Sequence, residues 1–249
     1  MKHLLRLGNL EVGKVPLVVG VISSDRTLDH LLDAPKQPFD VAEFRMDLIG
    51  VDTPGWLDKV HKLHHAGYPT ILTIRHPSEG GHWYREETER LAVYHHSLPY
   101  VGAVDAEISN TIFPTLAREA KAASRLAIGS FHDFHATPDD ATLECVIEEG
   151  ISHGADIVKI ATFIQSEEDA VRLSTLLTKH RDVPLCLLGM GPLGAETRVS
   201  LPLAGSCLTY GFVDQVSAPG QLSSAKLKER LMADSKAYLE YEMTRRTNG

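Results

Sequence analysis

The sequence predicts an α/β fold, a single (β/α)8 TIM barrel, on three observations. Its 249 residues match the usual size of such a barrel, about 250 residues. Short apolar runs, which are typical of strands buried on both faces, alternate along the chain with stretches that are typical of amphipathic helices. Eight strand-like runs follow one another at a spacing that leaves no room for a second domain. We therefore expect residues 1–249 to form one domain.

The first predicted element is a small hairpin in residues 1–14, where apolar and polar residues alternate around a Gly-Asn pair. Thr53 is the expected N-cap of the first helix, with Pro54 at the first helical position, where the missing N–H does no harm. The predicted strands are residues 17–22, 41–46, 70–74, 101–106, 126–131, 156–161, 185–188 and 208–213. Predicted helices between them include residues 53–66, 86–98, 111–124, 139–153 and 167–179.

A doubly wound open sheet is the alternative fold, and it normally carries a glycine-rich turn after its first strand. The segment 19–24, Val-Gly-Val-Ile-Ser-Ser, lacks such a turn, which favours the barrel. In a parallel barrel, side chains of one parity face the interior, and catalytic groups collect at the carboxyl ends of the strands. The polar residues at the strand ends should therefore share one parity along each strand.

The net charge of −8 argues against a nucleic acid or an anionic membrane as partner, because both favour a basic surface. An anionic ligand would need a few well-placed arginines. No apolar run reaches the length of a transmembrane helix, and the N-terminal residues lack the apolar core of a signal peptide.

Three widely spaced cysteines, Cys145, Cys186 and Cys207, fit neither a zinc motif nor a disulfide framework. We expect them to be buried thiols in a reducing compartment. With the lack of a signal peptide, this predicts a cytoplasmic protein.

Charged residues gather where the second, third and fourth predicted strands end. Glu43, Arg45 and Asp47 stand on alternate positions with apolar residues between them. If the apolar face packs on helices, the charges point into the mouth of the barrel, where unpaired ions are costly unless they pair or bind a polar ligand. A structural salt-bridge network is the alternative.

The next two strands end in the same way. Arg75 closes the third strand, and Glu79 follows four residues later in a turn-rich loop. Asp105 and Glu107 stand on alternate positions at the end of the fourth strand. Three consecutive strands that end in ionic residues predict an active-site mouth rather than a set of solvated loops.

A histidine, His132, ends the fifth strand and shares its parity with Ser130. His132 and His135 are compatible with metal ligation, but the other ligands would have to come from an arginine-rich pocket, which repels divalent cations. The position of His132 therefore favours acid–base chemistry over a metal site.

One lysine, Lys159, interrupts the apolar run of the sixth strand. Such a lysine either extends its ammonium group to solvent at the strand end or serves amine chemistry. Partial burial and neighbouring cations favour the free amine, which is a nucleophile for ketones. An amine and an imidazole on adjacent strands suggest imine formation followed by proton transfer at the adjacent carbon.

The loops after the last two strands carry further polar groups. Arg198 follows Gly191 and Gly194 and has the forked geometry that suits a carboxylate. Ser217 and Gln221 belong to a turn-forming segment that is suited to close over a ligand. Taken alone, such a segment is more often a plain surface loop.

In this order, the motifs resemble those of the type I 3-dehydroquinate dehydratases, the Schiff-base class of 3-dehydroquinase. The matching segments are residues 43–47, 75–81, 132–134, 158–160, 190–198 and 217–221. The resemblance implies a barrel whose base is closed by the N-terminal hairpin, with no cofactor and no metal. It also implies the dehydration of the small carboxylate 3-dehydroquinate to 3-dehydroshikimate, a step of the shikimate pathway and of aromatic amino acid biosynthesis.

The same resemblance implies a role for each candidate residue. Lys159 is similar to the amine that forms the Schiff base, His132 to the general acid and base, and Glu79 to the carboxylate that orients the histidine. By the same resemblance, the ring hydroxyls of the substrate would be bound by Glu43, Arg45 and Arg75. Its carboxylate would be bound by Arg198, Ser217 and Gln221. The chain departs from a common form of the family in having Gly20 in place of a ligand-contacting hydroxyl residue and Thr197 in place of serine.

Two rival functions remain compatible with the sequence. A class I Schiff-base aldolase on the same barrel would share Lys159 and would bind phosphate at the glycine-rich loops after strands seven and eight. A non-catalytic barrel that binds a carboxylate metabolite would use the arginines but not the amine. The oligomeric state is open, and a homodimer is compatible with the sequence.

Overall fold

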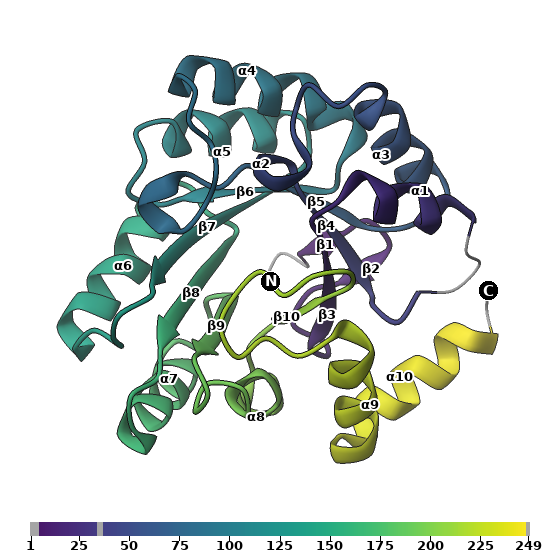
Figure 1. Cartoon of the computed structure of the whole chain (residues 1–249). Helices are drawn as coiled ribbons and strands as arrows, with labels where there is room; N and C mark the ends of the chain where they lie inside the picture. The colour runs from purple at the N-terminus through teal and green to yellow at the C-terminus, as the bar shows by residue number, and fades with distance from the viewer. Residues whose placement is uncertain (1–4, 34–36, 248–249) are drawn as a thin grey trace.

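The computed structural model describes residues 5–33 and 37–247, and within them eight parallel strands form one sheet that curls into a nearly closed barrel (Figure 1). The neighbouring strands follow the order β10-β3-β4-β5-β6-β7-β8-β9. Their bounds are β3 (Leu17–Ile22), β4 (Val41–Arg45), β5 (Thr70–Thr73), β6 (Ala103–Glu107), β7 (Leu126–Asp133), β8 (Ile157–Phe163), β9 (Leu185–Met190) and β10 (Leu208–Phe212). The predicted (β/α)8 TIM barrel is confirmed.

The barrel closes between β9 and β10, which lie side by side. The backbone N–H of Cys207, just before β10, donates to the carbonyl of Leu185 over 2.8 Å. The strands are almost entirely buried, because residues of one parity fill the barrel and those of the other pack under the surrounding helices.

Helices follow the strands and cover the outside of the barrel (Figure 1). They are α1 (Asp25–Asp33), α3 (Trp56–His65), α4 (Glu87–Ser97), α5 (Phe113–Ala122), α6 (Asp140–Ser152), α7 (Glu167–Lys179), α8 (Thr197–Ala204) and α9 (Ser224–Asp234), with α10 (Lys236–Thr247) after α9. Short helical turns are α2 (Met46–Ile49), η1 (Pro77–Glu79) and η2 (Leu98–Tyr100). No helix in the described ranges is long and apolar enough to cross a membrane. Of the three cysteines expected to be buried, Cys186 and Cys207 are, but Cys145 is exposed on α6, so that part of the prediction is wrong.

The start of α3 differs from the prediction. The helix begins at Trp56 after Gly55, which adopts a left-handed conformation with φ of 72°. The hydroxyl of Thr53 donates to the carbonyl of Ile49 over 2.9 Å and so belongs to the preceding turn. The prediction of Thr53 as the N-cap is wrong, because a hydroxyl that bonds backward in the chain is not available to the first N–H groups of the helix.

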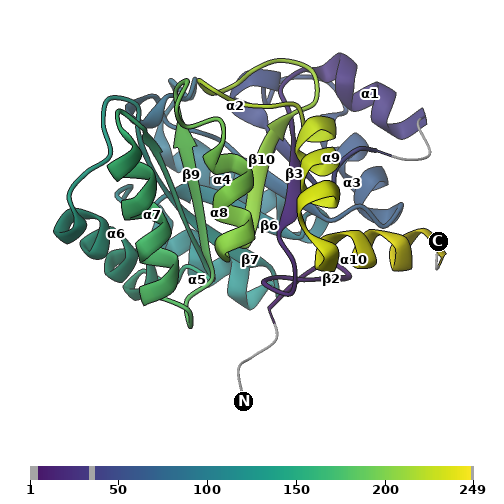
Figure 2. The same cartoon turned by 90° about the horizontal axis from the view of Figure 1, so that it is seen from below.

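The N-terminal hairpin lies at the base of the barrel. Strands β1 (Arg6–Leu7) and β2 (Leu10–Glu11) pair antiparallel around the Gly-Asn turn, while residues 1–4 of the predicted hairpin lie outside the described residues. Leu7 is fully buried, and its side chain packs against Gly102 just before β6. Figure 2 shows the hairpin at the opposite end of the barrel from the loop that follows β10.

The base is also held by one buried carboxylate, that of Asp40. Its Oδ2 accepts from the N–H of Val18 at 2.8 Å and from the hydroxyl of Tyr238 at 2.9 Å. Its Oδ1 accepts from Lys228 at 3.0 Å and from Arg245 at 2.6 Å. This group therefore ties α9 and α10 to the first barrel strand, far from the carboxyl ends of the strands.

Candidate active site

A pocket opens at the carboxyl ends of the strands, and its walls bring the predicted site residues together. All of the residues that the sequence analysis singled out as catalytic or substrate-binding line it, namely Glu43, Arg45, Arg75, Glu79, His132, Lys159, Arg198, Ser217 and Gln221. Apolar side chains complete the lining, among them Val21, Phe134, Leu188, Met190 and Tyr210.

The register of the sheet explains this convergence. Glu107, Ser130, Lys159 and Cys186 are successive partners across β6, β7, β8 and β9, so their side chains stand at one level of the barrel. Because side chains alternate between the two faces of a strand, residues two positions away, such as His132, face the same interior. The expectation that the polar residues share one parity is confirmed.

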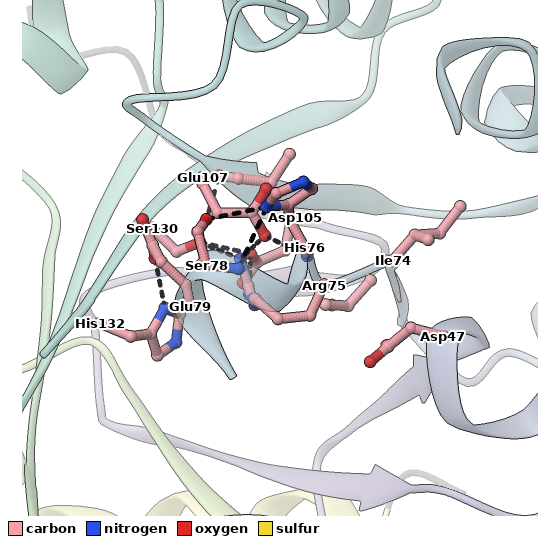
Figure 3. Close-up of polar contacts among 12 residues, drawn as sticks. Asp47, Ile74, Arg75, His76, Ser78, Glu79, Asp105, Glu107, Ser130 and His132 are labelled. Carbon is pink, nitrogen blue, oxygen red and sulfur yellow. Dashed lines mark hydrogen bonds and ion pairs between the residues drawn. The ribbon is translucent and has the colours of Figure 1, made fainter. Parts of the chain in front are cut away.

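Arg75 is the centre of a buried ion network (Figure 3). Its guanidinium donates to Asp105 at 2.5 Å, to Glu107 at 2.8 Å and to the hydroxyl of Ser130 at 2.5 Å. Glu107 also accepts from Arg90 on α4 at 2.7 Å. Burial opposes the charged form of Arg75, but the two carboxylates raise its pKa well above the ordinary value. The salt-bridge network that the sequence left open is thus present around this arginine.

The amine of Lys159 points into the barrel rather than to solvent, and the residue is 5% exposed. Its Nζ donates to Oδ2 of Asp105 at 3.0 Å and lies 4.2 Å from the centre of the Tyr210 ring. The charged partner in contact with the amine is therefore a carboxylate, whereas the sequence led us to expect cations around it. Burial would raise the pKa of Asp105, but Arg75 and Lys159 together lower it to about 2.

His132 is paired with Glu79, whose Oε2 lies 2.8 Å from the Nδ1 atom of the ring (Figure 3). Burial, with Arg75, Lys159 and Arg45 nearby, lowers the pKa of His132 well below its ordinary value. Burial raises the pKa of Glu79 to about 8, although Arg75 opposes this shift. At neutral pH the imidazole is therefore uncharged and able to accept a proton.

Arg45 and Glu43 are fixed by neighbours on the same rim. Arg45 forms a two-pronged pair with Asp47, at 2.9 Å from Nε and 2.7 Å from Nη2. Asp47 also accepts from the N–H of His82 at 3.2 Å, which ties the loop after β5 to β4. Glu43 accepts from the hydroxyl of Thr73 at 2.7 Å. Both side chains thus reach the pocket in defined orientations.

Arg198 is a buried cation without a carboxylate partner in the described ranges. It is 2% exposed, its Nη1 donates to the carbonyl of Tyr210 at 3.0 Å, and its Nε has no hydrogen-bond partner. Burial lowers its pKa to about 10. Since an unpaired buried charge is costly, the site is prepared for an anion.

Ser217 and Gln221 lie in the loop after β10. Oε1 of Gln221 accepts from the N–H of Ser217 at 2.9 Å and from its hydroxyl at 3.0 Å. The loop lies against the end of β9, since the N–H of Gly191 donates to Pro219 at 3.1 Å. A Cβ at Gly220 would stand 2.1 Å from the carbonyl oxygen of Gly191, so this approach requires glycine.

The two departures from the family pattern have structural explanations. A Cβ at Gly20 would lie 2.3 Å from the Phe39 ring, so position 20 faces away from the pocket, and the next residue, Val21, lines it instead. Thr197 uses its hydroxyl within the backbone, donating to Gly194 at 2.6 Å and accepting from Gly189 at 2.9 Å. Neither position offers a hydroxyl to a ligand.

Sequence reasoning did not assign a role to two residues in contact with the amine, Asp105 and Tyr210. Asp105 was visible as a charge of the interior parity on the fourth strand, and that parity was the available signal. Tyr210 has no such signal, because an aromatic residue in a strand is ordinary core. His135, considered as a metal ligand, does not line the pocket, and the described residues hold no group of three or more His, Cys, Asp or Glu side chains placed around a metal ion.

Comparisons with known proteins agree with one another. The model of the family described as type I 3-dehydroquinase matches residues 16–237. A 3-dehydroquinate dehydratase of Methanococcoides burtonii is 32% identical over 92% of this chain and 98% of its own, and that of Methanosarcina barkeri is 34% identical over the same shares. The crystal structure of the Geobacillus kaustophilus 3-dehydroquinate dehydratase superposes with a TM-score of 0.83 at 26% identity, covering 93% of this chain and 97% of that one. The chain belongs to the type I 3-dehydroquinase family.

Proposed function

We propose that the chain converts 3-dehydroquinate to 3-dehydroshikimate through an imine between Lys159 and the substrate ketone, with His132 as general acid and base. Membership of the family supports a dehydration in the shikimate pathway. One observation supports the proposed imine mechanism. The buried amine of Lys159, the uncharged imidazole of His132 and the unpaired guanidinium of Arg198 line one pocket.

The proposed chemistry uses the amine as the means of acidifying the substrate. A proton next to a ketone is too weakly acidic for an imidazole to remove easily. Conversion of the ketone to a protonated imine provides an acceptor for the electron pair, so that His132 removes the proton and leaves a neutral enamine. The enamine pair then expels the β-hydroxyl, which takes the proton from His132 and leaves as water. Hydrolysis of the conjugated imine releases the enone and restores Lys159.

The remaining polar groups would bind and orient the substrate. Arg198 supplies the unpaired charge for the carboxylate, with Ser217 and Gln221 beside it on the loop after β10. Arg45 and Glu43, each held by a neighbour, would bind the ring hydroxyls together with Arg75. A forked guanidinium binds a carboxylate and a phosphate in the same two-pronged way, so the family match, rather than Arg198, supports 3-dehydroquinate over the phosphorylated substrate of an aldolase.

The direct test is to incubate the protein with 3-dehydroquinate and to follow the absorbance of the enone product. We expect catalytic turnover, without product from phosphorylated aldol substrates. His132→Ala should still form an imine slowly but should lose more than the roughly 10²–10⁴-fold typical of acid–base catalysis, because one residue serves several steps. No enone at high protein concentration would contradict the proposed reaction, and near-native turnover of the variant would remove His132 from the mechanism.

A further inference from the structure

The carboxylate of Asp105 lies beneath the pocket and contacts the amine of Lys159. It is fully buried, and its Oδ2 lies 3.0 Å from Nζ. Its other oxygen, Oδ1, accepts from Arg75 at 2.5 Å and from the hydroxyl of Ser130 at 2.8 Å. Oδ1 thus bonds to the buried ion network, and Oδ2 bonds to the amine.

Imine formation conserves the charge at Nζ. The ammonium and the ketone together give a protonated imine and one water molecule: the C–N double bond forms, the carbonyl oxygen leaves with two protons, and the nitrogen keeps one proton and one positive charge. An ion pair that holds the ammonium in the free protein therefore finds the same charge in the covalent intermediate. Of the three N–H bonds of the ammonium, one remains, and its direction lies in the plane of the imine.

We propose that Asp105 is the counter-ion of the protonated imine, and that its Oδ2 accepts the remaining N–H and so keeps the imine charged and fixes its plane. This inference rests on the proposed function, since it requires the imine at Lys159. Because the carboxylate touches the reacting nitrogen, Asp105 is a catalytic residue in this scheme.

The other contacts of Asp105 suit this role. When the substrate loses its proton, the imine becomes a neutral enamine, and a counter-ion with no other partner would then be an unpaired buried charge. Arg75 and Ser130 keep Oδ1 bonded throughout, so the carboxylate is not left unpaired at that step. The face of the Tyr210 ring, 4.2 Å from Nζ, adds a second favourable contact for a cation.

Other charged and titratable groups line or border the same pocket on the surrounding elements. The cations are Arg45 from β4, Arg75 just after β5 and Arg198 from α8, and the carboxylates besides Asp105 are Glu43 from β4, Glu79 from η1 and Glu107 from β6. The groups held neutral by burial are His132 on β7, Cys186 on β9 and Tyr210 on β10. Arg75 is already paired with Glu107 and Glu43 with Thr73, so Asp105 is the carboxylate that contacts Nζ.

The test compares two reductants on the native protein and on Asp105→Asn in the presence of 3-dehydroquinate. Borohydride reduces neutral and protonated imines, whereas cyanoborohydride reduces the protonated form. The label added by cyanoborohydride, divided by the label added by borohydride, therefore reports the fraction of the imine that is protonated and does not depend on how much imine is formed. This ratio is measured as a function of pH. We expect the midpoint of this ratio to fall by about 1–3 pH units in the variant, the shift typical of losing an opposite charge at close range.

Asp156→Asn is the matched control, because Asp156 precedes the same strand, β8, at the base of the barrel, where it accepts from the N–H of Ala127. Its midpoint should equal the native one. Coinciding midpoints for the native protein and Asp105→Asn would overturn the inference, while the absence of any borohydride label on the native protein would instead contradict the proposed function.

A measurement on the native protein covers the case in which Asp105→Asn does not fold. The same ratio is measured for the imine that Nα-acetyl-lysine forms with cyclohexanone in water. The midpoint in the protein should lie at least about one unit higher. A midpoint at or below that of the free imine would also overturn the inference.

Discussion

The Nδ1 atom of His132 lies 2.8 Å from Oε2 of Glu79, and both side chains are nearly enclosed. Burial moves their two pKa values in opposite directions, lowering that of the imidazole and raising that of the carboxyl to about 8. At neutral pH the pair therefore holds two exchangeable protons, one on the imidazole and one on the carboxyl, and no net charge. This leaves the imidazole free to accept a proton, with a group beside it that stabilises the resulting cation once it ionises.

Glu79→Gln should change the pH dependence of stability. The native carboxyl keeps its proton up to about pH 8, while in the unfolded chain it ionises near 4.5. Its contribution to stability is therefore present at low pH and is lost as the pH rises through this window. Relative to the native protein, the variant should gain about 4 kcal/mol between pH 5 and pH 9, measured by denaturant unfolding.

Glu229→Gln provides the control for this comparison, since Glu229 is an exposed carboxylate on α9. Its stability difference from the native protein should stay flat over the same range. A flat difference for Glu79→Gln as well would contradict the shifted pKa. Turnover in Glu79→Gln should fall by about 10²-fold, the lower end of acid–base effects, because an amide cannot take up the charge.

Arg198→Met should weaken substrate binding while stabilising the fold. A charge-assisted hydrogen bond contributes about 1.5–3 kcal/mol, so KM should rise by about 10–200-fold. Stability should stay equal or increase by about 1–4 kcal/mol, because an apolar side chain replaces an unpaired buried charge. Steady-state kinetics and denaturant unfolding measure the two effects.

Arg90→Met is the matched control for Arg198→Met, because Arg90 is equally buried but is paired with Glu107 at 2.7 Å. That variant should lose about 3 kcal/mol of stability, as expected when a buried pair is broken. If Arg198→Met were destabilised as strongly as the control, Arg198 would have a structural role that the geometry does not predict.

Gly20→Ala should destabilise the protein without altering the pocket. The added Cβ would lie 2.3 Å from the Phe39 ring, and overpacking of this kind costs about 1–3 kcal/mol. KM of the folded variant should stay native, whereas Val21→Ala should raise KM because Val21 lines the pocket. A raised KM in Gly20→Ala, with native stability, would place position 20 on the ligand side after all.

Asp40→Asn should loosen the base of the barrel and spare the active site. The substitution removes the charge that pairs with Lys228 and Arg245, and breaking a buried ion pair costs about 3–5 kcal/mol. Thermal or denaturant unfolding should show this loss, with kcat per folded molecule unchanged because the pocket lies at the other end of the strands. A loss of kcat at full stability would point to coupling between the two ends.

The sequence was sufficient to place the pocket because a barrel imposes two simple rules. Alternation along each strand puts Glu43 with Arg45 and Ser130 with His132 on the interior face, and a parallel sheet brings all carboxyl ends to one rim. These rules require no distances. They hold for Lys159 as well, which is why a lysine within an apolar strand was identified as a candidate amine rather than as a surface residue.

The pairing of charges could not be derived in the same way. Arg75 had Glu79, Asp105 and Glu107 within possible reach, and its choice of the last two depends on side-chain conformations and on the curvature of the barrel. For the same reason the contact between Asp105 and Lys159 was missed. The N-cap prediction at Thr53 failed because its hydroxyl had a competing backbone acceptor, which a local pattern does not reveal.

Borohydride reduction of the native protein with 3-dehydroquinate, followed by peptide mass spectrometry, tests the central claim most directly. We predict that the native protein loses activity and gains the ligand mass on the peptide that contains Lys159. The Lys159→Ala variant should remain unlabelled, and it should be inactive with or without borohydride. A native protein that stays unmodified and fully active under these conditions would contradict the account.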